Sequence, residues 1–124
     1  MITARSLSYR YGELKAVDDV DFEVPEGEIF AFLGPNGAGK TTTIRMLTTL
    51  LAPSTGSVHI DGLDVREHPY ETRQRFGIVF QDSSLDSELT AWENMQIHAV
   101  LYRVPRAERV TRIEALLRLF ELWD

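Results

Sequence analysis

A short glycine-rich stretch contains the residues of this sequence that are best suited to bind phosphate. Residues 34–41 read Gly-Pro-Asn-Gly-Ala-Gly-Lys-Thr, which is the pattern G-x-x-x-x-G-K-[ST] in full. The glycines allow the backbone to bend and to approach a ligand without a clashing Cβ atom, so that amide N–H groups can converge on phosphate oxygens. We therefore expect a phosphate-binding loop that is followed by the N-terminus of a helix.

Polar side chains at the end of this loop have complementary roles. Lys40 supplies a positive charge for the β- and γ-phosphates of a nucleotide. The hydroxyl oxygen of Thr41 is a hard ligand suited to Mg²⁺, and Thr42 can donate to the α-phosphate. The alternative is a structural strand–helix turn with an exposed lysine, but three consecutive threonines are poor helix formers, which favours a phosphate site. The expected contacts are Gly34, Pro35, Asn36, Gly37, Ala38, Gly39, Lys40, Thr41 and Thr42.

Composition limits the kinds of function that remain. The chain has 124 residues, enough for one small domain, with 44% hydrophobic and 26% charged residues. A net charge of −6 argues against non-specific binding to nucleic acid. There is no cysteine for a disulfide or a thiolate site, and no run of about 20 apolar residues to span a membrane. His59, His68 and His98 do not cluster, and we interpret them as ordinary structural or surface residues.

Strand patterns surround the loop. Val20, Phe22 and Val24 alternate with acidic residues, which predicts a strand with one wet face that pairs with residues 2–11. Residues 29–33 are apolar without alternation and lie between turns, which predicts a strand buried on both faces, as in a parallel sheet. Residues 76–80 are predicted to form a second strand of this kind, and Asp61-Gly62 predicts a hairpin turn.

Helical patterns follow the loop and fill the last third of the chain. Ile44, Leu47 and Leu51 recur at helical spacing before Pro53, and Pro69 opens a short helix. Thr90 and Glu93 fit a capping box for a helix that extends to about residue 103. A final helix over residues 106–123 has an apolar face and two i,i+4 ion pairs on its exposed side. The face is Val110, Ile113, Leu117 and Phe120, and the pairs are Glu108–Arg112 and Glu114–Arg118.

The order of these motifs resembles the start of an ABC transporter ATP-binding subunit. The matching stretches are Tyr11-Gly12, residues 16–20, Pro25 to Glu28, residues 33–42, and Gly77 to Gln81 followed by Leu89 to Asn94. Residues 89–94 and 102–105 are similar to drug-export ATPases of the daunorubicin-resistance type. The resemblance implies a P-loop NTPase α/β core of the ABC ATPase type with an antiparallel β portion at its N-terminus. Residues 1–81 would form the nucleotide-binding core, and residues 82–124 the start of a helical subdomain that is truncated.

The resemblance also implies roles for two positions outside the loop. Tyr11 matches the aromatic residue that stacks on adenine; Tyr9, on the same strand face, is its rival, and an ordinary strand tyrosine is the alternative. Gln81 matches a glutamine that approaches Mg²⁺ and the attacking water and that senses the transmembrane partner. The expected metal contacts are therefore Thr41 and Gln81. The expected catalytic residues are Lys40 and Gln81. Without the resemblance, Gln81 would be a polar strand terminator.

The same resemblance implies cofactors and partners. The cofactors are ATP and Mg²⁺. The partners are a transmembrane permease subunit and a second ATP-binding subunit. Binding to the permease would hold the protein on the cytoplasmic face of the membrane. Residues 82–94 would face the permease, where Trp92 and Met95 would form either an apolar contact patch or part of the core. Export of a substrate, driven by ATP binding and hydrolysis, is the expected function.

Motifs that the family needs for hydrolysis are not found in these 124 residues. They are a Leu-Ser-Gly-Gly-Gln loop, an apolar strand ending in Asp-Glu, and a late histidine. We therefore expect hydrolysis by the complete protein but not by this chain, and an exposed apolar edge beside residues 29–33. The alternatives are another P-loop enzyme such as a GTPase or nucleotide kinase, a non-catalytic nucleotide-binding fragment, and a soluble ABC-type ATPase.

Overall fold

The computed structural model describes residues 1–80 and 84–123. The chain divides into two compact units, Met1–Ile78 and Val79–Asp124, and each is described by itself. The first contains the strands and the glycine-rich loop, and the second contains the two longest helices.

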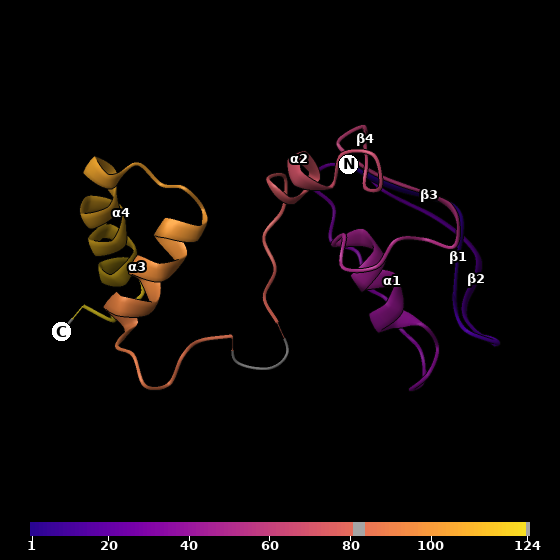
Figure 1. Ribbon diagram of the computed structural model, residues 1–124, viewed down its shortest axis with the longest axis horizontal. Helices are drawn as coiled ribbons and strands as arrows, with labels where there is room; N and C mark the ends of the chain where they lie inside the picture. The colour runs from indigo at the N-terminus through magenta and orange to yellow at the C-terminus, as the bar shows by residue number, and fades with distance from the viewer. Residues whose placement is uncertain (81–83, 124) are drawn as a thin grey trace. The chain divides into compact units, whose positions relative to one another are not determined.

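An antiparallel sheet of four strands organises the first unit (Figure 1). Its strands are β1 (Ile2–Tyr11), β2 (Leu14–Val24), β3 (Thr55–Ile60) and β4 (Leu63–Asp64), in the order β2-β1-β3-β4. The predicted pairing of residues 2–11 with the alternating strand is confirmed, since Ile2 lies opposite Val24 and Tyr11 opposite Leu14. The Asp61-Gly62 turn is also confirmed: both residues have positive φ, 49° and 80°, as a two-residue hairpin turn requires.

Helix α1 (Lys40–Leu47) packs against this sheet and completes its core. The core consists of Ala4, Leu7, Val17, Met46, Val58, Ile60 and Val65. The predicted apolar face of the helix is partly wrong, because Ile44 is 46% exposed and Met46 is the buried residue instead. The helix also ends at Leu47, well before Pro53. The predicted short helix is confirmed as α2 (Pro69–Arg73), which has proline in its first turn.

The two strands predicted for a buried parallel sheet are not strands in this structure. Residues 29–33 and 76–80 belong to no strand, and Ile29 and Leu33 are 101% and 90% exposed. A parallel strand requires neighbours on its edges and cover on both faces. For residues 29–33 the described part of the chain supplies no neighbouring strand, and only Phe30 and Phe32 pack against another residue, Phe22 of β2. The apolar pattern therefore identifies a strand-forming segment that has no partner here.

Two antiparallel helices form the second unit: α3 (Ala91–Leu101) and α4 (Arg106–Leu119). The capping box is confirmed, since the Thr90 hydroxyl accepts from the Glu93 amide at 3.2 Å and the Glu93 carboxylate accepts from the Thr90 amide at 2.9 Å. The two ion pairs predicted on α4 are also present, at 2.6 and 2.9 Å.

The apolar face predicted for α4 is only partly buried. Ile113 and Leu117 are buried with Ala99, and Trp92 and Met95 pack against them, so these two side chains belong to the core of this unit. Val110 and Phe120 are 54% and 66% exposed, because two helices cover only a narrow strip of each other. No helix in the described residues is long and apolar enough to cross a membrane.

Candidate nucleotide-binding site

Three glycines give the loop a backbone shape that other residues adopt only with strain. Gly34, Gly37 and Gly39 have φ values of 153°, 85° and 83°. At Gly39 a Cβ atom would also lie 2.4 Å from the carbonyl oxygen of Ala16 and 3.2 Å from Cγ2 of Val17 on β2. The loop therefore lies against β2 at a position where only glycine fits.

Unpaired amides gather where the loop becomes helix α1. Gly39 is the N-cap and has no side chain to cap the helix. The first backbone hydrogen bond of the helix is donated by the Thr43 amide to the Gly39 carbonyl, at 2.8 Å. The amides of Lys40, Thr41 and Thr42 precede it and have no acceptor within the helix. Three N–H groups at the positive end of a helix dipole are suited to an anion.

Lys40 is held close to the entrance of the same loop. Its Nζ donates to the carbonyl oxygens of Gly34 and Pro35, both at 2.6 Å. These acceptors are neutral, and a phosphate oxygen would be a stronger acceptor for the ammonium group. A bound phosphate would therefore replace these carbonyl oxygens as the acceptor of the Lys40 ammonium group.

The loop borders a depression of about 390 Å³ in the first unit. Its lining combines loop and α1 residues with part of β2 and the preceding apolar segment: Lys15, Ala16, Val17, Asp18, Val20, Phe32, Leu33, Gly37, Ala38, Lys40 and Thr43. This volume lies in the usual range of ligand pockets. Sequence reasoning missed Lys15 and Asp18, which form an ion pair at its edge, because they are distant from the motif in sequence and belong to no motif themselves.

The remaining residues of the predicted site are Thr41, Thr42, Tyr11 and Gln81. Thr41 is exposed, whereas Thr42 is buried. Tyr11 lies at the end of β1, is 43% exposed and meets Tyr9 edge to face with ring centroids 4.8 Å apart, but it does not line the depression. Gln81 lies outside the described residues.

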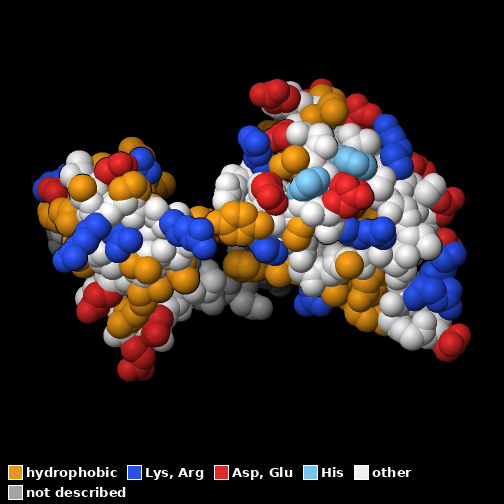
Figure 2. All heavy atoms as spheres, turned by 45° about the horizontal axis from the view of Figure 1, so that its top comes forward, with side chains coloured by type: hydrophobic (Ala, Val, Ile, Leu, Met, Phe, Trp, Pro, Cys, Tyr) orange, Lys and Arg blue, Asp and Glu red, His pale blue; other side chains and the backbone are white. Residues whose placement is uncertain are grey.

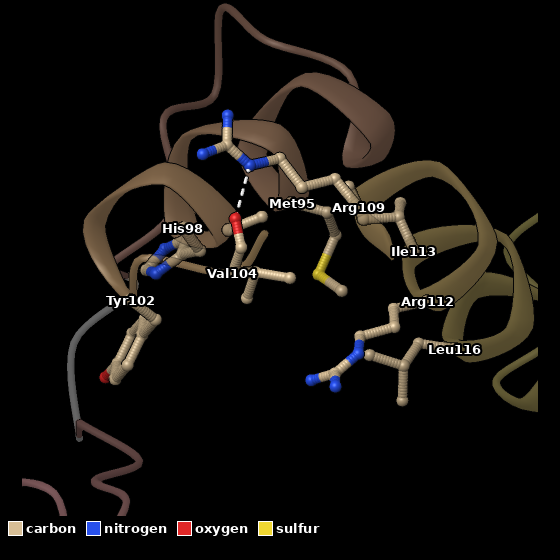
Figure 3. Close-up of a pocket in the computed structure, with 9 residues that line it drawn as sticks. Met95, His98, Tyr102, Val104, Arg109, Arg112, Ile113 and Leu116 are labelled. Atoms are coloured by element: carbon tan, nitrogen blue, oxygen red, sulfur yellow. Dashed lines mark hydrogen bonds between the residues drawn. The ribbon is translucent and has the colours of Figure 1, made fainter. Parts of the chain in front are cut away.

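Another cavity, of about 230 Å³, lies between α3 and α4 (Figure 3). Figure 3 shows Met95, Val104, Ile113 and Leu116 around it, with arginines from α4 nearby. Both arginines have partners within this unit: Nε of Arg109 donates to the Val104 carbonyl at 2.8 Å, and Arg112 pairs with Glu108. A mostly apolar cavity with engaged arginines is less suited to a triphosphate than the glycine-rich loop.

Comparison with known proteins identifies the family of this chain. A family model described as "ABC transporter" matches residues 17–124. The daunorubicin resistance ATP-binding protein DrrA3 of Streptomyces coeruleorubidus is 39% identical over 99% of this chain and 39% of its own length. The ABC transporter ATP-binding protein NatA of Bacillus subtilis is 41% identical over 100% of this chain and 52% of its own.

A solved structure supports the same conclusion for the fold. An ATP-binding cassette, solved as a dimer in a post-hydrolysis state with ADP and Pi, superposes with a TM-score of 0.77 and 29% identity. The match covers 98% of this chain and 57% of that chain. This chain thus spans about 40 to 60% of the length of these relatives. It belongs to the ABC transporter family and has the fold of the N-terminal portion of that family's ATP-binding domain.

Proposed function

We propose that residues 34–42 bind the phosphates of ATP together with Mg²⁺, as part of an ABC transporter ATPase that drives export of a substrate. The observation that carries this proposal is the convergence of the left-handed glycines, the three amides at the start of α1 and the Lys40 ammonium group on one loop. Amides and ammonium supply the donors that a triphosphate needs, and the loop borders a depression with room for a ligand.

The residues fit a Mg²⁺ ion held jointly with the nucleotide. The exposed hydroxyl of Thr41 is a hard oxygen next to the amides that would hold the β-phosphate. When bound, the ion would neutralise phosphate charge. Lys40 would leave the carbonyls of Gly34 and Pro35 for the β- and γ-phosphates, and Tyr11 would offer its exposed ring to the adenine. Gln81 remains the proposed second contact to the metal and to the attacking water.

In the complete protein, we propose two such subunits and a transmembrane permease as partners, on the cytoplasmic side of the membrane. Similarity to a daunorubicin resistance protein supports export, and similarity to a dimeric cassette supports pairing of two ATP-binding subunits. The residues of this chain would hold the phosphates, but its sequence lacks the apolar strand ending in Asp-Glu and the late histidine that the family needs for hydrolysis. We therefore expect ATP binding without turnover from these 124 residues.

Calorimetric titration of the chain with Mg·ATP tests nucleotide binding. Lys40→Ala removes the ammonium group at the loop, and Arg45→Ala removes one positive charge from an exposed position of the same helix. We expect saturable binding by the wild type and by Arg45→Ala, and at least a tenfold loss of affinity in Lys40→Ala, as about 1.4 kcal/mol would produce. Equal affinities in all three proteins would contradict the proposed site. Phosphate release that disappears in Lys40→Ala would contradict the absence of turnover.

A further inference from the structure

Two tyrosine rings form an edge-to-face pair at the end of β1. The ring centroids of Tyr9 and Tyr11 lie 4.8 Å apart, and the ring planes are inclined by 68°. This geometry is favourable, because the positive edge of one ring meets the negative face of the other. Residues two apart on a strand lie on the same face of the sheet, so the position of the two tyrosines in β1 brings their side chains together.

The two rings differ in how far they are buried. Tyr9 is half-buried and packs against the core of the first unit, whereas Tyr11 is 43% exposed. Figure 2 shows hydrophobic side chains among charged ones on the visible face of the molecule, and single exposed apolar groups of this kind are normal. Exposure alone therefore does not single out Tyr11. Its distinguishing feature is the contact with a second ring that the core holds in place.

The backbone that carries the exposed ring is held on both sides. On the side of β2, Tyr11 lies opposite Leu14. On the side of β3, the Arg10 amide donates to the hydroxyl oxygen of Ser54 at 3.2 Å. With the backbone held, the Tyr11 ring can move only by rotation about its own side-chain bonds. The contact with Tyr9 restricts that rotation, so the exposed ring is ordered before any ligand binds.

The ordered ring lies a short distance along β2 from the glycine-rich loop. Leu14 is opposite Tyr11, and the loop touches β2 at Ala16, whose carbonyl oxygen leaves no room for a Cβ atom on Gly39. Two residues of a strand correspond to about 7 Å. Lys15, between these two points, lines the depression beside the loop. A nucleotide with its phosphates on the loop can therefore reach Tyr11 with its base, since its ribose and first phosphate span such a separation.

We propose that Tyr9 is a positioning residue, which holds the Tyr11 ring in the orientation that stacks on the adenine of ATP. This inference rests on the proposed function, in which Tyr11 offers its ring to the adenine, and it assigns a role to a tyrosine that does not touch the nucleotide. A ring that is already ordered loses little freedom when the base binds. Without Tyr9, binding of the base would also have to order Tyr11, and the affinity for ATP would fall.

Calorimetry with two ligands separates this role from a general loss of stability. Mg·ATP has a base, whereas Mg·tripolyphosphate offers the loop a triphosphate without one. Tyr9→Leu keeps an apolar group against the core but removes the ring, and we expect it to bind Mg·ATP about two- to tenfold more weakly, as the ordering of one side chain costs. Its affinity for Mg·tripolyphosphate should not change. Tyr9→Phe keeps the ring and should bind both ligands like the wild type.

Phe76→Leu is the matched control, because Phe76 is also a half-buried aromatic residue that packs against the same core. We expect its affinities for both ligands to equal those of the wild type. A circular dichroism spectrum of each variant verifies that it folds.

Nuclear magnetic resonance of the nucleotide-free chain tests the ring contact directly. The Tyr11 ring signals, assigned with Tyr11→Phe, should move in Tyr9→Leu, because the neighbouring ring current is lost, and should stay in place in Phe76→Leu. Signals that do not move in Tyr9→Leu would show that the pair is absent in solution and would overturn the proposal.

The binding outcomes distinguish failure of this inference from failure of the proposed function. Equal affinity of the wild type and Tyr9→Leu for Mg·ATP would overturn the role of Tyr9 and leave the phosphate site intact. An equal loss of affinity for both ligands in Tyr9→Leu would do the same, because it would show an effect on the loop and not on the base. A wild type that binds neither ligand would contradict the proposed function itself, and this inference with it.

Discussion

Replacement of Gly39 by alanine tests whether the loop is built against β2 as described. Gly39 has a φ of 83°, and an added Cβ atom would lie 2.4 Å from the Ala16 carbonyl oxygen. Gly37 offers a matched control in the same loop, since its φ is 85° but no atom lies within 4 Å of an added Cβ. The two substitutions therefore share the backbone strain and differ in the steric contact.

The expected magnitudes follow from these two contributions. An alanine in the left-handed region costs about 1–2 kcal/mol, which is the whole effect expected for Gly37→Ala. At Gly39 the contact with a backbone atom cannot be relieved by a side-chain rotation, and overpacking of this kind adds about 1–3 kcal/mol. We expect Gly39→Ala to lower the free energy of unfolding by about 2–5 kcal/mol in total.

Urea unfolding of the two variants and the wild type, followed by far-ultraviolet circular dichroism, measures the difference. The reasoning requires Gly39→Ala to be less stable than Gly37→Ala. Equal stabilities would show that the loop does not lie against Ala16 in solution, and the explanation of the motif by close packing would then be wrong. Calorimetry with Mg·ATP on whichever variant remains folded would separate a loss of stability from a loss of binding.

Two further predictions concern the cores and caps of the units. Leu7→Ala should lower the free energy of unfolding of the first unit by about 2–5 kcal/mol, because Leu7 is fully buried in the sheet core. Urea unfolding measures this loss. A loss below about 1 kcal/mol would contradict the described core. The backbone N–H and then the hydroxyl of Thr90 lower the pKa of Glu93 below its ordinary value of 4.5. This carboxylate therefore stabilises α3 above pH 4.5, and the contribution is lost as the pH falls through the lowered pKa. Helicity followed by circular dichroism on acidification should show this loss, and Thr90→Ala should reduce it; identical titrations would contradict the capping box.

Local patterns were sufficient to predict the loop and the caps. The glycine positions, the turn at Asp61-Gly62 and the Thr90–Glu93 capping box depend on backbone angles and on contacts within a few residues. Such features are encoded in short stretches, so the residues themselves identify them. The pairing of the first two strands was also predictable, because alternation over many residues leaves one register that buries the apolar face.

Contacts between distant residues decided the rest. Lys15 and Asp18 border the loop only because β2 passes beneath Gly39, and no spacing in the sequence indicates that approach. Val110 and Phe120 fit a helical apolar face but remain exposed, since a face is buried only where another element covers it. Residues 29–33 have the composition of a buried strand, but a strand also needs a hydrogen-bonded neighbour. Whether a neighbour is present depends on the tertiary structure and cannot be read from these five residues.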